Sequence, residues 1–179
     1  MSSPILEAKN ISKTFGNIKA LDNVDFYLQK GFVHGLLGEN GAGKSSLMNI
    51  LSGMYIPESG SIKINNQKIE KMTPDIAASF GIGMVHQEFR LIESFSIKDN
   101  LTLSKANIFT DNFKEAYDKY SEIFALNSNY LTPVNELSVG EKQKVEIMKL
   151  IFKNSQIMLL DEPTAVLTPQ ETLQLKDSL

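Results

Sequence analysis

The amino-acid sequence predicts an α/β fold: a core sheet that carries a phosphate-binding loop, an antiparallel β subdomain and an inserted α-helical subdomain. Three observations predict this class. A buried-strand pattern at residues 32–37 runs directly into a glycine-rich loop and then a helical pattern. A second apolar strand, residues 156–160, ends in two carboxylates. Between about residues 96 and 152 the apolar spacing is helical. The sheet domain is expected at 1–87 and 153–179, and the helical subdomain at about 88–152.

Composition indicates a globular protein of one domain, with or without a small subdomain. The 179 residues are 42% hydrophobic and 22% charged, which is typical of soluble domains. A net charge of −3 argues against a broad basic surface for nucleic acid. No cysteine is present, so disulfides are excluded. No apolar run approaches the roughly 18 residues of a membrane helix, so any work at a membrane requires a partner.

Two strands are expected first, at residues 5–11 and 24–28, with a turn at residues 13–16 between them. Phe15 lies in this turn, ahead of the glycine-rich loop. It is either an aromatic that stacks on adenine or a phenylalanine at the edge of the core, and the residues alone favour neither.

The glycine-rich loop fits the phosphate-binding pattern G-x-x-x-x-G-K-[ST]. Glycines let successive backbone N–H groups point at an anion. Lys44 can reach the β- and γ-phosphates, and the Ser45 hydroxyl can bind Mg²⁺. A strand before the loop and a helix after it, ending near Gly53, support this over an ordinary glycine turn. The residues expected to hold the nucleotide here are Gly38, Glu39, Asn40, Gly41, Ala42, Gly43, Lys44, Ser45 and Ser46.

Further elements follow along the chain. A turn is expected at 57–60, short antiparallel strands at 61–64 and 68–69 around an Asn65-Asn66 turn, and a helix capped by Thr73. A buried strand at 82–85 ends in His86 and Gln87. An α/β sheet usually places site residues at such strand ends, although His86 alone indicates a structural histidine.

The next region is helical. Ser96 can cap one helix, a loop follows at 107–112, and residues 113–126 carry an apolar stripe that predicts core. Residues 127–135 form a connection. Ser138 and Glu141 have the spacing of a capping box. A helix start can also bind an anion, since its free N–H groups and dipole favour phosphate.

The strand at 156–160 ends in Asp161 and Glu162. Beside a phosphate loop, Asp161 would hold Mg²⁺ and Glu162 would orient the attacking water. The alternative is a solvated turn, which the phosphate-binding loop disfavours. Thr168 opens a last helix that runs to Leu179.

Taken in order, these motifs resemble the nucleotide-binding domain of ABC-type ATPases. The segment 137–141 separates this family from other phosphate-loop proteins. In more detail, the amino-acid sequence resembles that of the ATP-binding subunits of sugar and nucleoside importers. The segments that carry this resemblance are 38–45, 84–87, 137–141 and 161–171.

The resemblance implies ATP and Mg²⁺ as cofactors, with Lys44, Gln87 and Glu162 as the catalytic residues and Ser45, Gln87 and Asp161 at the metal. Two such domains pack head to tail, so Ser138, Gly140 and Glu141 would bind the nucleotide of the partner domain. Phe15 takes the place of the adenine-stacking aromatic.

The partners implied are a second ABC domain, a transmembrane permease contacted by the Gln87 loop and, indirectly, a solute-binding protein. The expected location is the cytoplasmic face of the membrane, with no nucleic acid bound.

Some positions depart from the family pattern. Glu141 stands where glutamine is common, although the importer group often has glutamate there. Thr168 replaces a usual aspartate, and no histidine follows Asp161. The missing switch histidine and last strands predict the N-terminal part of a longer, tandem ATPase, which alone would turn over little ATP. The alternatives are a soluble ABC ATPase that acts on ribosomes or DNA and a nucleotide-binding module without turnover.

Overall fold

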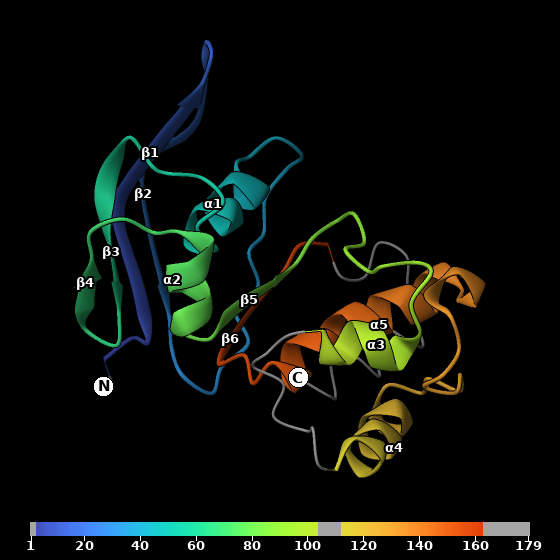
Figure 1. Ribbon diagram of the computed structural model, residues 1–179. Coiled ribbons are helices and arrows are strands. Elements are labelled where there is room, and N and C mark those ends of the chain that lie inside the picture. Colours follow the sequence, from blue (N-terminus) through green and yellow to red (C-terminus); the bar gives the residue numbers. More distant parts are fainter. Residues whose placement is uncertain (1–2, 104–111, 163–179) are drawn as a thin grey trace. The chain divides into compact units, whose positions relative to one another are not determined.

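The computed structural model describes residues 3–103 and 112–162, and the chain divides into two compact units, Met1–Ile82 and Gly83–Leu179 (Figure 1). Most of the loop expected at 107–112 and the whole helix expected from Thr168 lie outside the described residues.

The first unit contains an antiparallel sheet with the strand order β2-β1-β3-β4. Alternating apolar residues build it, because Leu6, Ala8 and Ile11 of β1 and Ile62 and Ile64 of β3 turn one face inward. The bounds are Leu6–Phe15 for β1, Ile18–Leu28 for β2, Ser59–Ile64 for β3 and Gln67–Ile69 for β4. The expected antiparallel subdomain is confirmed.

The first hairpin is longer than the sequence pattern predicted. The turn is at residues 16–17 and β1 extends through Phe15, which pairs with Ile18. Gly16 adopts φ 57, the left-handed conformation that a two-residue hairpin turn needs. The turn expected at 13–16 is therefore wrong. The turn expected at 57–60 also ends early, since β3 begins at Ser59.

Two local expectations in this unit are confirmed. Asn65 and Asn66 form the tight β3–β4 turn with φ 50 and 64. Thr73 caps α2 (Pro74–Ser79), where its side chain accepts a hydrogen bond from the Ile76 N–H at 3.3 Å.

Residues 32–37 do not form the buried strand that their apolar pattern predicted. They have no regular structure, and Phe32, Val33 and Leu37 are 68%, 76% and 93% exposed. A strand exists only where a neighbour pairs with its N–H and C=O groups. Within the described residues no strand pairs with this segment, so its apolar residues alone do not make it a strand.

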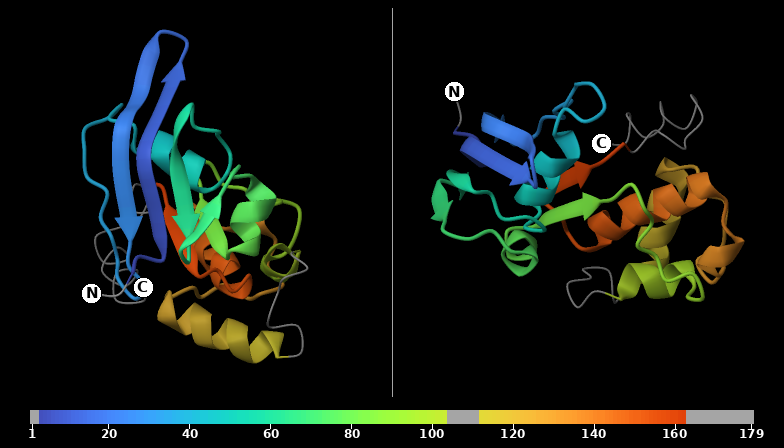
Figure 2. Two further views of the ribbon diagram at one scale, coloured as in Figure 1. Left: turned by 90° about the vertical axis from the view of Figure 1, so that its left-hand side faces the viewer. Right: turned by 90° about the horizontal axis from the view of Figure 1, so that it is seen from above.

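The second unit holds most of a two-stranded sheet, β5 (Ile82–Val85) with β6 (Ile157–Leu160), and a group of helices. The helices are α3 (Ile97–Thr102), α4 (Phe113–Ile123), the 3-10 turn Val134–Glu136 and α5 (Val139–Phe152). Helix α3 packs against α5 (Figure 2).

The core of the second unit includes the apolar stripe predicted at 113–126. Phe113, Tyr117, Phe124 and Leu126 are buried. Rings of this stripe contact Phe152 of α5, at a centroid distance of 5.5 Å from Phe113. The expectation that this stripe is core is confirmed.

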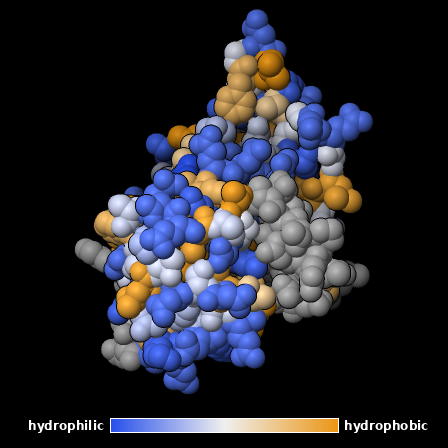
Figure 3. All heavy atoms as spheres, turned by 90° about the vertical axis from the view of Figure 1, so that its right-hand side faces the viewer, coloured by the Kyte–Doolittle hydropathy of each residue, from blue (hydrophilic) through white to orange (hydrophobic). Residues whose placement is uncertain are grey.

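In the described ranges, none of the helices combines the length and the apolar character needed to cross a bilayer. The face in Figure 3 is mostly hydrophilic, with hydrophobic side chains scattered over it.

Candidate functional site

The glycine-rich loop enters α1 (Lys44–Leu51) through two left-handed residues, Gly41 and Gly43, with φ 84 and 87. Gly43 is the N-cap of α1. A Cβ at Gly43 would lie 2.4 Å from the carbonyl oxygen of Ala20 on β2. Only glycine fits this conformation at this separation, so β2 fixes the start of α1.

The Lys44 side chain lies back over its own loop. Its Nζ donates hydrogen bonds to the carbonyl oxygens of Gly38 at 2.8 Å and Glu39 at 2.9 Å. The Ala42 N–H donates to the Glu39 oxygen at 3.1 Å, which closes a turn. Helix α1 is anchored on its other side by the buried residues Leu47, Ile50 and Leu51. The first helical turn holds Lys44, Ser45 and Ser46, and the exposed loop positions are Gly38, Glu39, Asn40, Gly41 and Ala42.

Phe15 lies at the end of β1 with 40% of its surface exposed. Its ring makes an edge contact with Tyr55 at a centroid distance of 5.2 Å, and the Lys13 ammonium lies 5.4 Å from the ring centre. Phe15 pairs with Ile18 of β2, two residues before the Ala20 that contacts Gly43. The same hairpin therefore carries Phe15 and supports the loop. Stacking on adenine stays a prediction.

Three predicted residues follow the ends of β5 and β6 in the second unit. The Asp161 N–H donates to the Val85 oxygen at 3.2 Å, so both strands end at one edge. Asp161 is 7% exposed. Gln87 and Glu162 are exposed, and Glu162 has φ 48, a conformation that is unusual for a non-glycine residue. Gln87, Asp161 and Glu162 thus follow the paired ends of β5 and β6, and their roles stay predictions.

His86 precedes Gln87 and is half-buried. Burial lowers its pKa below the ordinary value of 6.5, and the Arg90 guanidinium lowers it further. A neutral imidazole at pH 7 suits the structural role that the sequence indicated.

The start of α5 contains the predicted capping box. The Ser138 Oγ accepts from the Glu141 N–H at 3.3 Å and donates to the Glu141 Oε2 at 2.8 Å, and the Ser138 N–H donates to the same oxygen at 2.9 Å. Gly140, in the same first turn, is half-buried. The Ser138 hydroxyl proton is thus directed at Glu141, and a role toward a phosphate requires it to change partner.

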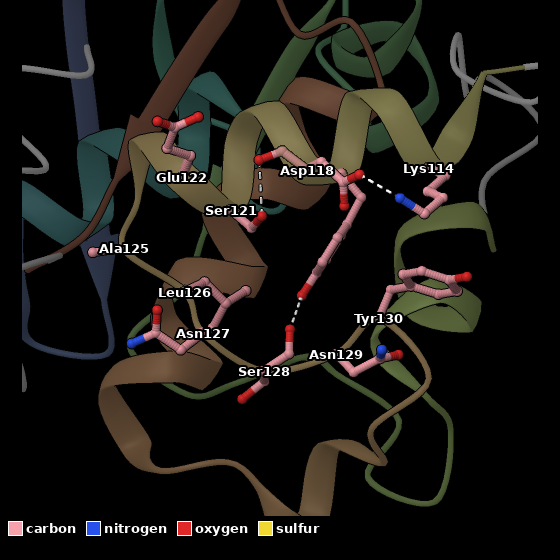
Figure 4. Close-up of a pocket in the computed structure, with 11 residues that line it drawn as sticks. Lys114, Asp118, Ser121, Glu122, Ala125, Leu126, Asn127, Ser128, Asn129 and Tyr130 are labelled. Carbon is pink, nitrogen blue, oxygen red and sulfur yellow. Dashed lines mark hydrogen bonds and ion pairs between the residues drawn. The ribbon is translucent and has the colours of Figure 1, made fainter.

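A hydrogen-bond chain joins Glu141 to α4, and its Ser128 part is drawn in Figure 4. The Ser128 Oγ donates to the Glu141 Oε1 at 2.5 Å, and the Tyr117 hydroxyl donates to the Ser128 carbonyl at 2.6 Å. Tyr117 and Ser128 border an open hollow of about 610 Å³ between α4 and residues 125–130. Burial raises the pKa of Tyr117 to about 12, assisted by Asp118 and Glu141.

Opposed effects act on the Glu141 carboxyl. Burial raises its pKa, whereas hydrogen bonds from Ser128 and Ser138 and the charge of Lys144 lower it. The net pKa lies below the ordinary value of 4.5, so Glu141 is ionised at neutral pH.

The predicted metal ligands are all oxygen donors. They are the hydroxyl of Ser45, the carboxamide of Gln87 and the carboxylate of Asp161, the hard donors that suit Mg²⁺. Across residues 3–103 and 112–162, no group of three or more histidine and carboxylate side chains could hold a metal ion. A donor set with one carboxylate is the kind that suits Mg²⁺ held mainly by substrate phosphates.

Sequence reasoning assigned no role to several buried polar residues of the second unit. Asn100 and Glu146 are 2% and 3% exposed. A signal existed for Glu146, which lies between the apolar residues Val145 and Ile147 and three residues before Lys149.

Comparison with known proteins places these features in one family. The family model described as ABC transporter matches residues 21–165. The guanosine import ATP-binding protein NupO of Bacillus subtilis is 40% identical, over 96% of this chain and 34% of its own length. The ribose import protein RbsA of Caldanaerobacter subterraneus is 44% identical, over 96% and 36%. The galactose/methyl galactoside import protein MglA of Clostridium perfringens is 45% identical, over 97% and 35%.

The chain thus spans about a third of the length of these curated relatives. A solved nucleotide-free ATP-binding cassette from an ABC transporter matches with a TM-score of 0.83 and 27% identity, over 98% of this chain and 75% of that one. A cassette solved as a dimer with ADP and Pi matches with a TM-score of 0.83 and 25% identity, over 97% and 80%. The chain therefore belongs to the ABC transporter family, as an ATP-binding domain related to sugar and nucleoside import proteins.

Proposed function

We propose that this chain binds and hydrolyses ATP and thereby powers import of a small solute, a sugar or a nucleoside, through a membrane permease. The observation that carries the proposal is the order of motifs within the family match: a phosphate loop, Gln87, the capped start of α5 and the Asp161-Glu162 pair. The relatives named for guanosine, ribose and galactose import support the solute class.

In this proposal the loop and the first turn of α1 hold the triphosphate. Backbone N–H groups around Gly41 and Gly43 contact the phosphates, as do those of Ser45 and Ser46. Lys44 exchanges its bonds to the Gly38 and Glu39 carbonyls for phosphate oxygens. Phe15 stacks on the adenine.

The strand-end residues handle the metal and the water. Mg²⁺ supplies positive charge that neutralises the phosphate oxygens in the transition state. Ser45, Gln87 and Asp161 hold it, and Glu162 orients and polarises the attacking water. Burial of Asp161 suits this role, because a partly desolvated carboxylate interacts more strongly with a cation.

A second cassette completes the site. Ser138, Gly140 and Glu141 at the start of α5 meet the γ-phosphate bound by the partner domain, and the Ser138 hydroxyl then leaves the Glu141 carboxylate. The related cassette solved as a dimer with ADP and Pi is compatible with such pairing. ATP drives closure because it binds the paired form better than the open one.

The remaining partners follow from the importer class. The domain works at the cytoplasmic face of the membrane through its permease, which the Gln87 loop contacts, and a solute-binding protein acts indirectly. The sheet domain comprises residues 1–87 and 153–179, with the helical subdomain at about 88–152. The net charge of −3 disfavours the ribosome or DNA alternative.

Reconstitution tests the proposal. The full protein, assembled with its permease in vesicles, should couple ATP hydrolysis to uptake of ribose, galactose or guanosine. Glu162→Gln should retain ATP binding and lose at least about 10²-fold in hydrolysis. Hydrolysis stimulated by ribosomes or DNA, with no sugar or nucleoside uptake, would contradict the importer assignment.

A further inference from the structure

The backbone of Arg90, three residues beyond Gln87, is held by two charged side chains of α5. The Arg90 N–H donates to the Glu146 Oε1 at 2.5 Å, and the Lys149 Nζ donates to the Arg90 carbonyl at 3.0 Å. The Lys149 Nζ and the Glu146 Oε2 form an ion pair at 2.8 Å. One turn of α5 therefore satisfies both backbone groups of a single residue.

The backbone of Ile92 is held in the same way by α3. The Asn100 Oδ1 accepts from the Ile92 N–H at 2.7 Å, and the Asn100 Nδ2 donates to the Ile92 carbonyl at 3.0 Å. Leu91 between them points into the apolar core. The backbone N–H and C=O groups of residues 90 and 92 are thus hydrogen-bonded as they would be by a neighbouring strand. Here side chains of α5 and α3 supply the partners that a strand backbone would supply.

This arrangement is costly if its only role is stability. Glu146 is 3% exposed, and the Lys149 side chain is 13% exposed. Desolvating such a pair offsets most of its attraction, and well-packed apolar residues stabilise a core equally well. What apolar residues cannot do is fix a backbone segment by its N–H and C=O groups.

We propose that Glu146, Lys149 and Asn100 are positioning residues. They hold residues 87–92, the Gln87 loop, in one fixed position against α5 and α3 of the second unit. The inference rests on the proposed role of Gln87 at the metal and water. Helix α5 begins with the capping box of Ser138. The contacts of Glu146 and Lys149 with the Arg90 backbone therefore also connect the Gln87 loop to the helix that is proposed to face the partner's nucleotide. Loop and helix then respond to nucleotide as one body.

The test uses the full protein assembled with its permease. Glu146→Ala should lower kcat about 10-fold and leave the dissociation constant for ATP within about 2-fold, because the phosphate loop is untouched. Glu146→Gln keeps an acceptor for the Arg90 N–H and should recover most of the activity. Lys149→Met removes the donor to the Arg90 carbonyl and should behave like Glu146→Ala. Glu115→Gln, on the exposed side of α4, is the control and should match wild type.

Amide hydrogen exchange separates positioning from general destabilisation. In Glu146→Ala, exchange should accelerate at residues 88–92 while residues 143–152 stay protected. If Glu146→Ala does not fold, the same two measurements on Lys149→Met decide the question. Unchanged kcat, or equal loss of protection in α5 and in the loop, overturns the inference. An absence of ATP hydrolysis in wild type would instead contradict the proposed function.

Discussion

Gly43 is the N-cap of α1 with φ 87, and the carbonyl oxygen of Ala20 lies 2.4 Å from where its Cβ would be. The positive φ of Gly43 comes from the turn of the loop, whereas the lack of room for a Cβ comes from the nearby backbone of β2. At the scale of the residue, the phosphate loop is therefore defined by its contact with the antiparallel sheet as well as by its own glycines.

Gly43→Ala should lower the free energy of unfolding by about 1–3 kcal/mol from the backbone conformation alone, and should weaken ATP binding as the loop shifts away from β2. Urea unfolding and titration with a fluorescent ATP analogue measure the two effects. Gly35→Ala is the matched control, because a Cβ there meets nothing within 4 Å and φ is not positive. Equal stability and affinity in the two variants would contradict this account.

At the scale of the element, α5 combines several tasks in 14 residues. Its first turn contains the Ser138–Glu141 capping box, and its middle carries the pair that holds Arg90. Its end supplies Phe152 to the core. The sequence pattern indicated the cap and the apolar face, while the polar contacts depend on which segments pack beside the helix.

The cap should make stability depend on pH. The folded pKa of Glu141 lies below its ordinary value of 4.5, so its contribution is present above about pH 4.5 and is lost as the pH falls through the folded pKa. Stability curves from pH 7 to 3 should show Glu141→Gln less stable than wild type at neutral pH, with the difference shrinking in acid. The same difference for Glu115→Gln, on the exposed side of α4, should be smaller. A pH-independent gap for Glu141→Gln would show that its charge does not matter.

At the scale of the whole molecule, the proposed site is shared between two cassettes. The phosphate loop and the start of α5 lie in different compact units of the chain, and each is proposed to face a partner.

Glu162→Gln should therefore trap a paired state. In the full protein it should bind ATP and remain closed, because the bound nucleotide is not consumed. A spin-label or fluorescence pair on exposed residues of the two cassettes, outside the nucleotide site, should shorten its distance on addition of ATP with Mg²⁺. The double change Glu162→Gln with Lys44→Ala is the control and should stay open. An ATP-independent distance would argue against nucleotide-driven pairing.

Much of the fold was predictable because its signals are local. Caps at Thr73, Ser96 and Ser138 fixed helix starts, and the Asn65-Asn66 pair fixed a hairpin turn. The phosphate loop was readable for the same reason, since its glycines and Lys44 act within eight residues.

Other features required the tertiary structure. The extent of the first hairpin and the irregular state of residues 32–37 depend on which strand is available to pair, and pairing is non-local. The partners of Glu146 and Asn100 lie 56 and 8 residues away. The sequence by itself determined the family and the order of its motifs, because each motif, the phosphate loop above all, consists of contiguous residues that can be recognised without the fold. Only the tertiary structure decided what supports those motifs, since a buried polar group is explained by the neighbours that packing brings to it.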